Sequence, residues 1–479
     1  MNNKATYLFA SCLFLLSIAL TQQSNAQNSL GIVWEVPSDT AGVNEQLEEF
    51  SELGVTHIEV SHPVPSSIME LLERSNLAVL IRSGNRFFTV SEIGVQSDQL
   101  TQNYIDFAEQ YRPYLNVAGL GLLSHSHFEH PLFSDVFNPI IDSLSTVSNK
   151  SFYFFQREKW YNFGNPQQPF GTFYPDQSYQ PSDLFAFDSA MHSLIATNSD
   201  QLLFIQSSWF LEAISQYPEL SNSLIEYQEK NLWELPFPNT NDQGVAANWM
   251  VLILLLLWAA LAIQMKYLPY VRPLIVRFYL AHRFYVDDIL HYRERYLAPG
   301  ILMMVKHAIF GGLVFYIVAK ILLSQHGIAA FFHHLPFFAI TGSNYFSFFF
   351  FGLILILLTQ ILALLWLHLP AKSLDHFSQT VNLYAGSFYI DFLIITLMIT
   401  LFVAQIGSSL TLIFAAVYVL IWFLAFNLAA FDASRSMGSG RFLYLFLTIG
   451  LHTVLSFAAV LLILLNTNLI EILNLAISL

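Results

Sequence analysis

The sequence predicts two parts of different fold class: an exported α/β domain forming a (β/α)8, TIM-like barrel, then an all-α domain of six transmembrane helices. Hydrophobic residues make up 54% of the chain and charged residues 11%, which is outside the range of soluble globular proteins. The uncharged run from Val245 to Ile263 is long enough to span a membrane. Before this run, short β-rich segments alternate with amphipathic ones, which predicts parallel βαβ units.

The first 26 residues have the pattern of a signal peptide. Lys4 precedes an apolar core from Tyr7 to Leu20, and Ser24-Asn25-Ala26 offers small residues for cleavage. Cys12 allows an alternative, a lipidated lipoprotein site. Because Cys12 is the single cysteine, an intrachain disulfide framework and a thiolate metal site are excluded. The sequence therefore predicts export by a bacterium.

Residues 27–244 carry the strand and helix patterns of the barrel. Strands are predicted at 31–36, 56–61, 77–83, 117–123, 151–156, 201–206 and 231–235. Helices are predicted at 43–54, 66–76, 97–112, near 136–147, near 183–196 and near 209–229. Seven or eight repeats in about 215 residues suit a closed barrel better than an open doubly wound sheet. The open sheet is the alternative, but the chain lacks a glycine fingerprint for phosphate.

One stretch resembles a known superfamily. The run LGVTHIEVSHPVPSSIMELLERSNLAVLIRSG (53–84) is similar to the second and third βα units of the glycoside hydrolase barrels, and the likeness extends over about 30–235. The resemblance implies an acid/base role for Glu129, which follows the fourth strand. It also implies a nucleophile carboxylate after the seventh strand, where this chain has Gln206-Ser207-Ser208. A hydrolase and an inactive, sugar-binding barrel therefore both stay open.

The predicted site is built from residues at the C-terminal ends of the strands, where barrel enzymes place their chemistry. Glycoside hydrolysis needs two carboxyl groups that flank the bond, and aromatic rings usually stack on the sugar. The candidate catalytic carboxylates are Glu35, Glu59, Glu129 and Glu234. The candidate substrate-binding residues are His62, Arg82, His125, His127, Arg157, Trp160, Trp209 and Trp233.

Two segments have more than one interpretation. The run HSHFEH (125–130) has the ligand types of a metal site, but it is equally open to substrate hydrogen bonding or to a surface loop. The Pro- and Gly-rich segment 162–183 is predicted to be a long loop, either a lid over the site or an irregular structural loop. Because no partner carboxylates for the histidines are identifiable, the sequence predicts neither a metal nor a cofactor.

Six spans are predicted in the second half, near 246–265, 301–323, 344–369, 387–406, 408–430 and 442–466. Lys and Arg occur in the connections 266–300, 370–386 and 431–441. None occurs in the connections 324–343 and 407 or in the tail 467–479. By the positive-inside rule, the basic connections are cytoplasmic, so the barrel and both mature termini are expected in the periplasm of a bacterial inner membrane.

Three features of the membrane half are interpreted separately. Segment 266–300 alternates aromatic and basic residues, which favours a cytoplasmic interfacial helix. Segment 328–340 is too short to span and is predicted to be re-entrant or surface-lying. The last five spans are similar to Yip-type five-span membrane proteins, which implies scaffolding or trafficking. Polar residues predicted inside the membrane, candidates for function, are Lys306, His307, Lys320, Gln360, Asp391, Gln405, Asn427 and His452. Of these, Lys306 and Asp391 are interpreted as snorkelling or capping residues near the cytoplasmic ends.

The sequence thus predicts a membrane-anchored, glycoside-hydrolase-like barrel that binds or hydrolyses envelope or exported polysaccharide. The alternative is a non-enzymatic component of an envelope assembly or of transport, with the barrel as a binding module. Expected partners are the lipid bilayer, a carbohydrate or envelope polymer, and other membrane proteins. Nucleic acid is excluded as a partner, because residues 27–245 carry 8 Lys and Arg against 27 Asp and Glu.

Overall fold

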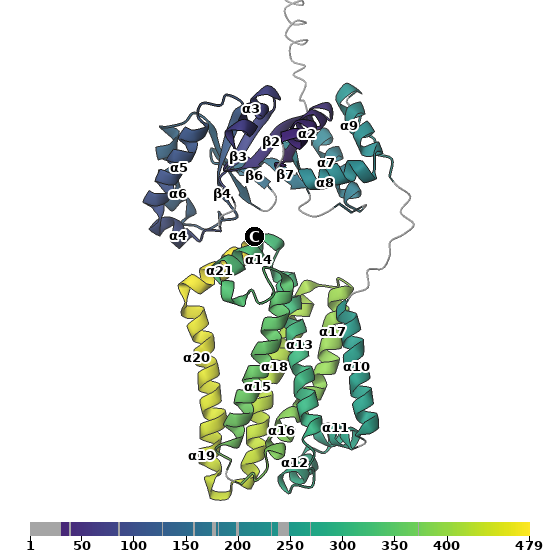
Figure 1. The fold of residues 1–479 in the computed structure, drawn as a ribbon. Helices are drawn as coiled ribbons and strands as arrows, with labels where there is room; N and C mark the ends of the chain where they lie inside the picture. The colour runs from purple at the N-terminus through teal and green to yellow at the C-terminus, as the bar shows by residue number, and fades with distance from the viewer. Residues whose placement is uncertain are drawn as a thin grey trace, which may run out of the picture. The chain divides into compact units, whose positions relative to one another are not determined.

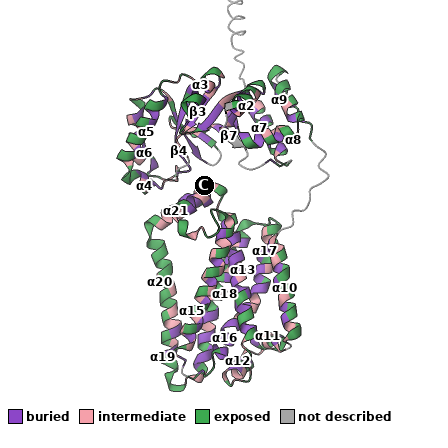
Figure 2. Ribbon diagram, viewed as in Figure 1, coloured by how far each residue is buried: buried purple, intermediate pink, exposed green. Residues whose placement is uncertain are grey.

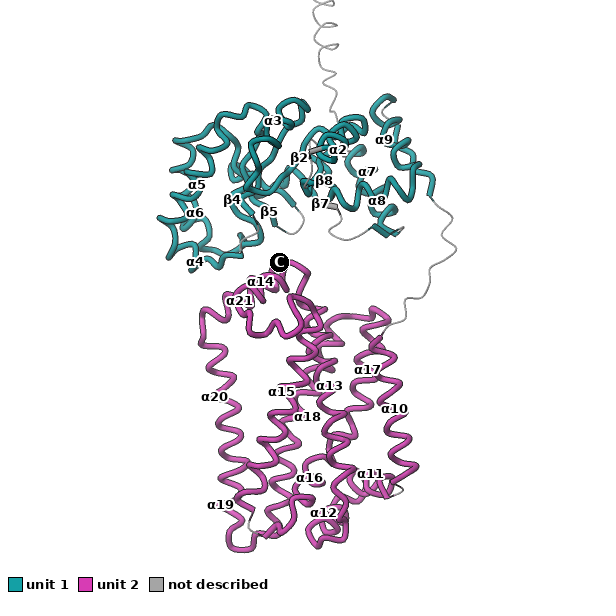
Figure 3. The backbone as a smooth tube through the Cα atoms, viewed as in Figure 1, with its two compact units in different colours: residues 1–243 teal, residues 244–479 magenta. Residues whose placement is uncertain are grey.

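The computed structural model describes residues 30–479 apart from 38–39, 85–86, 127, 157–158, 175–178, 181, 198–200, 231, 238–248, 269 and 372. The chain forms two compact units, residues 1–243 and 244–479 (Figure 3). The predicted signal peptide lies outside the described residues, and so does Cys12.

The first unit contains a closed barrel of eight strands, in which each strand is hydrogen-bonded to its neighbours in chain order and β8 returns to β1. The strands are β1 (Leu30–Val33), β2 (Val55–Ser61), β3 (Ala78–Arg82), β4 (Val117–Ser124), β5 (Ser151–Gln156), β6 (Lys159–Asn162), β7 (Asn165–Tyr174) and β8 (Leu202–Gln206). All neighbours are parallel except that β6 runs antiparallel to β5 and to β7. The prediction of a closed barrel is confirmed, but the sheet is mixed rather than all-parallel.

Helices surround most of the barrel (Figure 1). They are α2 (Thr40–Glu52), α3 (Ser66–Arg74), α4 (Val90–Val95), α5 (Ser97–Tyr111), α6 (Phe133–Ser145), α7 (Asp183–Thr197), α8 (Ser207–Gln216) and α9 (Glu219–Lys230). The chain passes from β5 to β6 and from β6 to β7 without a described helix. Strict strand–helix alternation therefore breaks at this point of the barrel.

Two predicted elements near this break are corrected by the structure. The segment predicted as a loop, 162–183, contains the end of β6 and all of β7. Pro166 and Pro169 suppress the strand signal there, and the β6–β7 pairing accommodates them with register shifts. In the strand predicted at 231–235, the described residues 232–235 have no regular structure, and β7 supplies the eighth strand instead.

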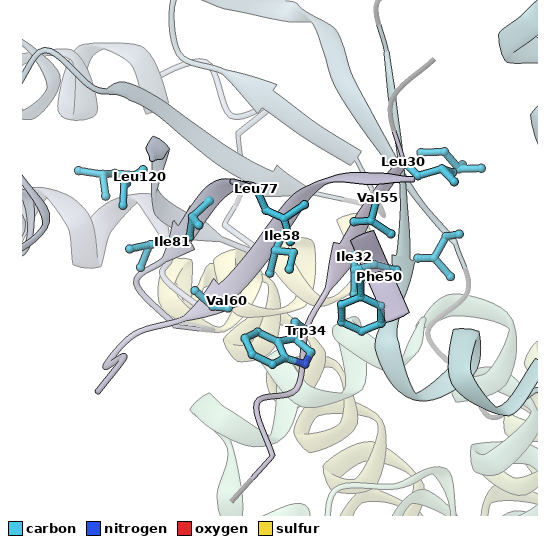
Figure 4. Close-up of a cluster of buried hydrophobic side chains, with 14 of the residues drawn as sticks. Leu30, Ile32, Trp34, Phe50, Val55, Ile58, Val60, Leu77, Ile81 and Leu120 are labelled. Atoms are coloured by element: carbon cyan, nitrogen blue, oxygen red, sulfur yellow. The ribbon is translucent and has the colours of Figure 1, made fainter. Parts of the chain in front are cut away.

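Alternating strand residues divide the barrel into two hydrophobic layers. Ile32, Ile58 and Ile81 face outward, where they join Phe50 of α2 in the core between strands and helices (Figure 4). The residues that face inward form a separate cluster. Its members are Leu80, Tyr153, Phe155, Trp160, Leu202 and Phe204. The barrel is therefore filled by side chains, and any polar group among them lies in a closely packed interior.

Within its described residues, the second unit has six helices that are long and apolar enough to cross a membrane, as predicted. These candidate spans are Trp249–Tyr267, Ala298–Leu322, Tyr345–His368, Phe377–Val403, Ser408–Ser436 and Gly438–Leu465. The corresponding long helices are α10 (Trp249–Tyr267), α13 (Ala298–Leu322), α15 (Tyr345–His368), α17 (Asp391–Val403), α18 (Ser408–Ala433) and α20 (Leu451–Leu465). The shorter helices are α11 (Val271–Leu280), α12 (His282–Leu290), α14 (Gln325–His334), η1 (Pro336–Phe338), α16 (Phe377–Ala385), η2 (Gly386–Ile390), η3 (Ser434–Ser436), η4 (Gly438–Gly440), α19 (Arg441–Leu445), η5 (Phe446–Gly450) and α21 (Thr467–Ser478).

The spans differ greatly in how far they are packed inside this unit. In the apolar 18-residue stretch of the second span, which is α13, 67% of the residues are buried, whereas in that of the last span, which contains α20, only 6% are buried (Figure 2). Glycines allow α13 to approach α15, because a Cβ on Gly312 would lie 2.8 Å from the carbonyl oxygen of Phe349. The second unit is thus a bundle around α13 with the last helix at its margin.

Candidate functional site

The only carboxylate among the predicted site residues that lies buried inside the barrel is that of Glu59. In β2, Ile58 and Val60 face the helices, so the side chain between them points into the interior. Glu59 is 1% exposed. A carboxylate so far removed from water needs hydrogen bonds and a counter-charge, since burial of an isolated charge is costly.

Two aromatic side chains donate hydrogen bonds to the same oxygen of Glu59. The Tyr153 hydroxyl lies 2.8 Å from Oε1, and Trp160 Nε1 lies 2.9 Å from it. Arg82 supplies the counter-charge, with Nη1 at 3.9 Å from Oε2 and its guanidinium over the Phe155 ring. Glu59, Tyr153, Trp160 and Arg82 form one group, which connects the barrel interior to the surface because Arg82 is partly exposed. They are called the Glu59 cluster below.

Tyr153 is fixed as a proton donor by its surroundings. Burial raises the pKa of Tyr153 well above its ordinary value, and the negative charge of Glu59 raises it further. The Arg82 charge acts in the opposite direction but does not outweigh these effects. The phenol therefore keeps its proton and donates it in the hydrogen bond to the Glu59 carboxyl group.

Glycines in the strands give the large lumen residues their space. A Cβ on Gly121 of β4 would lie 2.7 Å from Tyr153 Cζ, and one on Gly171 of β7 would lie 2.7 Å from Phe204 Cε2. Ordinary van der Waals contact begins at about 3.4 Å, so these positions need glycine or movement of the rings. The glycines in VAGLGLL thus serve packing of the lumen.

A second set of polar groups meets where β1 and β8 end. Gln206 Nε2 donates to Glu35 Oε1 at 2.9 Å, and the Glu35 backbone N–H donates to Ser207 Oγ at 3.0 Å. Glu35 is exposed. Val33 pairs with Glu59 across the β1–β2 ladder and packs against the lumen cluster. Glu35, two residues further along, therefore projects toward the same side of the wall, beyond Glu59.

The other two candidate carboxylates lie apart from the Glu59 cluster. Glu129 is exposed in the loop between β4 and α6. Glu234 is also exposed and lines a pocket of about 400 Å³ together with α9 residues, including Glu219 and Glu226. Strand register thus brings Glu35 toward Glu59, whereas the described side-chain contacts of Glu59 are with Tyr153, Trp160 and Arg82.

The three candidate tryptophans are all buried. Trp160 stacks on Phe204 inside the barrel at a centroid distance of 4.3 Å. Trp209 of α8 donates to Asp183, and Trp233 donates to Asp188 of α7. In this structure none of these rings presents an open face on which a sugar could stack.

The candidate histidines and arginines have separate surroundings. Nδ1 of His62 lies 2.8 Å from the Tyr111 hydroxyl of α5, so this ring belongs to the strand–helix layer. His125 is fully buried, in a left-handed backbone conformation, with its ring stacked on Phe87. His127 and Arg157 lie outside the described residues. Among the residues that are described, no group of three or more His, Cys, Asp or Glu side chains could hold a metal ion.

Sequence reasoning missed Tyr153 and Gln206 as members of the site. A signal existed for both. In SFYFFQ the aromatic residues alternate between the two faces of β5, so Tyr153 and Phe155 share the inward face. In β8 the same alternation places Gln206 on the face of Leu202 and Phe204.

The membrane unit contains a second group of polar contacts. His307 of α13, Asp391 of α17 and Tyr418 of α18 meet in the bundle, and Lys306 donates to Gln264 of α10. Asp391 is fully buried, and Lys306 is 5% exposed. The structure therefore corrects the interpretation of these two as snorkelling or capping residues, because both have partners on another span.

These features define the class of protein: an integral membrane protein that combines a closed eight-stranded barrel with a six-span helical unit. No family model matches the chain, and no curated protein matches it.

Proposed function

We propose that this protein is a carbohydrate-binding protein of the bacterial inner membrane, with a glycoside-hydrolase-like barrel that holds envelope or exported polysaccharide in the periplasm. The proposal rests on the polar side chains where β1 and β8 end, at one end of a barrel whose interior is filled by side chains. Glu35 and Gln206 are joined there by a hydrogen bond, and the Glu59 cluster lies beneath them. Carboxylate and amide groups are suited to sugar hydroxyls, which both donate and accept.

The state of Glu59 favours binding over hydrolysis. A general acid or nucleophile must reach the glycosidic bond, and a pair of carboxyl groups must flank it about 5–10 Å apart. Glu59 is 1% exposed, and three side chains already engage it. Glu129, to which the superfamily resemblance gives the acid/base role, is exposed in a loop.

The orientation in the membrane follows from charge. The ends of the spans that carry Lys266, Arg435 and Arg441 are joined by the basic connections, and the opposite connections contain no Lys or Arg. The positive-inside rule assigns the basic ends to the cytoplasm. An odd number of crossings separates these ends from residue 243, which supports the proposed periplasmic barrel.

The test uses the full-length protein in lipid nanodiscs and a panel of envelope polysaccharides. We expect binding without release of reducing ends. Glu35→Ala should weaken binding at least about tenfold, since it removes a charged hydrogen-bonding group worth about 1.5–3 kcal/mol. Glu129→Gln is the matched control and should bind as the wild type does. Equal binding by Glu35→Ala and the wild type, or no binding to any polymer by folded protein, would contradict the proposal.

A second candidate function is hydrolysis by Glu35 and Glu59, because the β1–β2 register directs both toward the same side of the wall. In that case the wild type would release reducing ends, and both Glu35→Gln and Glu59→Gln would abolish turnover while Glu129→Gln kept it. Loss of turnover in Glu129→Gln alone would instead support the acid/base role that the resemblance implies. A third possibility, an envelope assembly component, would show as binding to protein and not to polymer.

A further inference from the structure

Three polar side chains from three spans meet inside the membrane unit. Nδ1 of His307 in α13 lies 2.6 Å from Oδ2 of Asp391 in α17, and both side chains are fully buried. Tyr418 of α18 lies on the other side of the imidazole ring. Phe388 stacks on this ring at a centroid distance of 3.9 Å. Ionisable groups in such a position are expensive for a membrane protein to retain.

The hydrogen bonds determine where the protons lie. The Tyr418 hydroxyl has one hydrogen, which it donates to the backbone carbonyl of His307 at 2.8 Å. The same hydroxyl oxygen lies 3.3 Å from His307 Nε2. Because its hydrogen is donated elsewhere, the oxygen can only accept a hydrogen bond from Nε2. For this contact to be a hydrogen bond, Nε2 must carry the hydrogen.

With a hydrogen on Nε2, a neutral imidazole has only a lone pair on Nδ1. An ionised carboxylate has only lone pairs as well, and two acceptors repel at the 2.6 Å that separates Nδ1 from Oδ2. One proton between these atoms removes the repulsion, and the pair then has no net charge. Whether the proton resides on nitrogen or on oxygen, the observed contact needs it.

The described neighbours of the pair have other partners or are phenols. Lys306, next to His307 in the chain, points to Gln264 of α10. Among the described residues, the phenols of Tyr279, Tyr384 and Tyr418 also lie within electrostatic range of Asp391, and none of them is a cation. Asp391 Oδ1 has no hydrogen-bond partner among the described residues.

A second histidine–aspartate pair in the membrane unit differs from the His307–Asp391 pair in its counter-charge. His282 Nε2 lies 2.8 Å from Asp432 Oδ2, but Arg435 Nη2 also lies 3.0 Å from Asp432 Oδ1. A permanent cation therefore accompanies Asp432 whether or not His282 is charged. Among the described residues, His307 is the side chain that is hydrogen-bonded to Asp391, so the charge of this pair depends on one proton.

We propose that His307 and Asp391 form a proton-binding site inside the membrane unit, in which the shared proton holds α13 against α17 and its loss separates the two side chains. The ligand is a single proton. The site couples protonation to the arrangement of α13, α17 and α18, and it is independent of what the barrel binds.

The test follows thermal unfolding of the full-length protein in nanodiscs of neutral lipid, from about pH 5 to about pH 10. If the folded state holds a proton that the unfolded chain gives up, stability must fall as the pH rises through the transition. Asp391→Asn should abolish this fall, because the asparagine amide can donate to Nδ1 at every pH. Asp432→Asn is the matched control and should keep the wild-type transition.

Three outcomes would overturn the proposal. The first is an Asp391→Asn variant whose stability falls with pH as in the wild type. The second is a transition that shifts when sodium replaces a bulky organic cation, since the site would then bind a metal cation. The third needs no variant: infrared difference spectra of the wild type that show no change in aspartate or histidine bands across the transition.

Discussion

Gly121→Ala should destabilise the barrel by about 3 kcal/mol. The new Cβ would lie 2.7 Å from Tyr153 Cζ and 2.9 Å from its hydroxyl oxygen, about 0.5–1 Å too close. The ring cannot move freely, because its hydroxyl is hydrogen-bonded to Glu59 at 2.8 Å. Overpacking costs about 1–3 kcal/mol, and weakening a hydrogen bond to a charged group adds about 1.5–3 kcal/mol if the ring shifts.

The measurement is pulse proteolysis of full-length protein in detergent over a urea series, with fragments of the barrel followed by gel. Gly94→Ala in α4 is the matched control, since its Cβ meets only Val136 Cγ1 at 3.8 Å. It should be neutral or stabilising by up to about 1 kcal/mol. In a Tyr153→Leu background the Gly121→Ala substitution should cost much less, because the ring that it strikes is gone. An equal cost in both backgrounds, or a cost below about 0.5 kcal/mol in the wild type, would refute the packing argument.

Two further predictions concern pH and the bundle. Burial lowers the pKa of His57 below its ordinary 6.5, so the folded state favours the neutral ring. The stability of the protein should therefore be full above about pH 6.5 and fall as the pH drops through the lowered pKa. The urea midpoint measured near pH 7.5 and pH 5.5 should therefore drop more in the wild type than in His57→Asn, and parallel drops would contradict the assignment. In the bundle, Gly312→Ala should lower the melting temperature in detergent, because the atom in its way is the Phe349 carbonyl oxygen at 2.8 Å, which cannot rotate aside. Gly450→Ala, whose nearest neighbour is Phe446 Cδ2 at 3.6 Å, should melt with the wild type.

The sequence predicted the parts of the fold that depend on local periodicity. The six long apolar helices and the strand–helix repeats of the barrel follow from patterns within single segments. The β6–β7 hairpin does not follow from such a pattern, because the prolines within 165–174 are typical of a loop. Only closure of the barrel between β5 and β8 identifies this segment as a strand. A closing strand is a property of the whole barrel, which no single window of sequence contains.

The site was predictable only in part for the same reason. Strand ends identified Glu59 and Arg82 from their positions along the chain. Their partner Tyr153 is 94 residues from Glu59, and only the closed barrel brings the two together. In the membrane unit, His307 and Asp391 are 84 residues apart, so the sequence identified each residue but not their pairing. Pairing across such separations depends on tertiary packing, which hydropathy alone does not contain.

The last span has a consequence for how the membrane unit assembles. Because only 6% of its apolar 18-residue stretch is buried inside the described unit, most of its length is available to contact the acyl chains of a bilayer. Its stability then comes from insertion into lipid and little from contacts with the bundle. The five preceding spans can thus pack against one another before the sixth span is in place. Bilayer thickness should act on the tilt of the sixth span more directly than on the tilt of the other five.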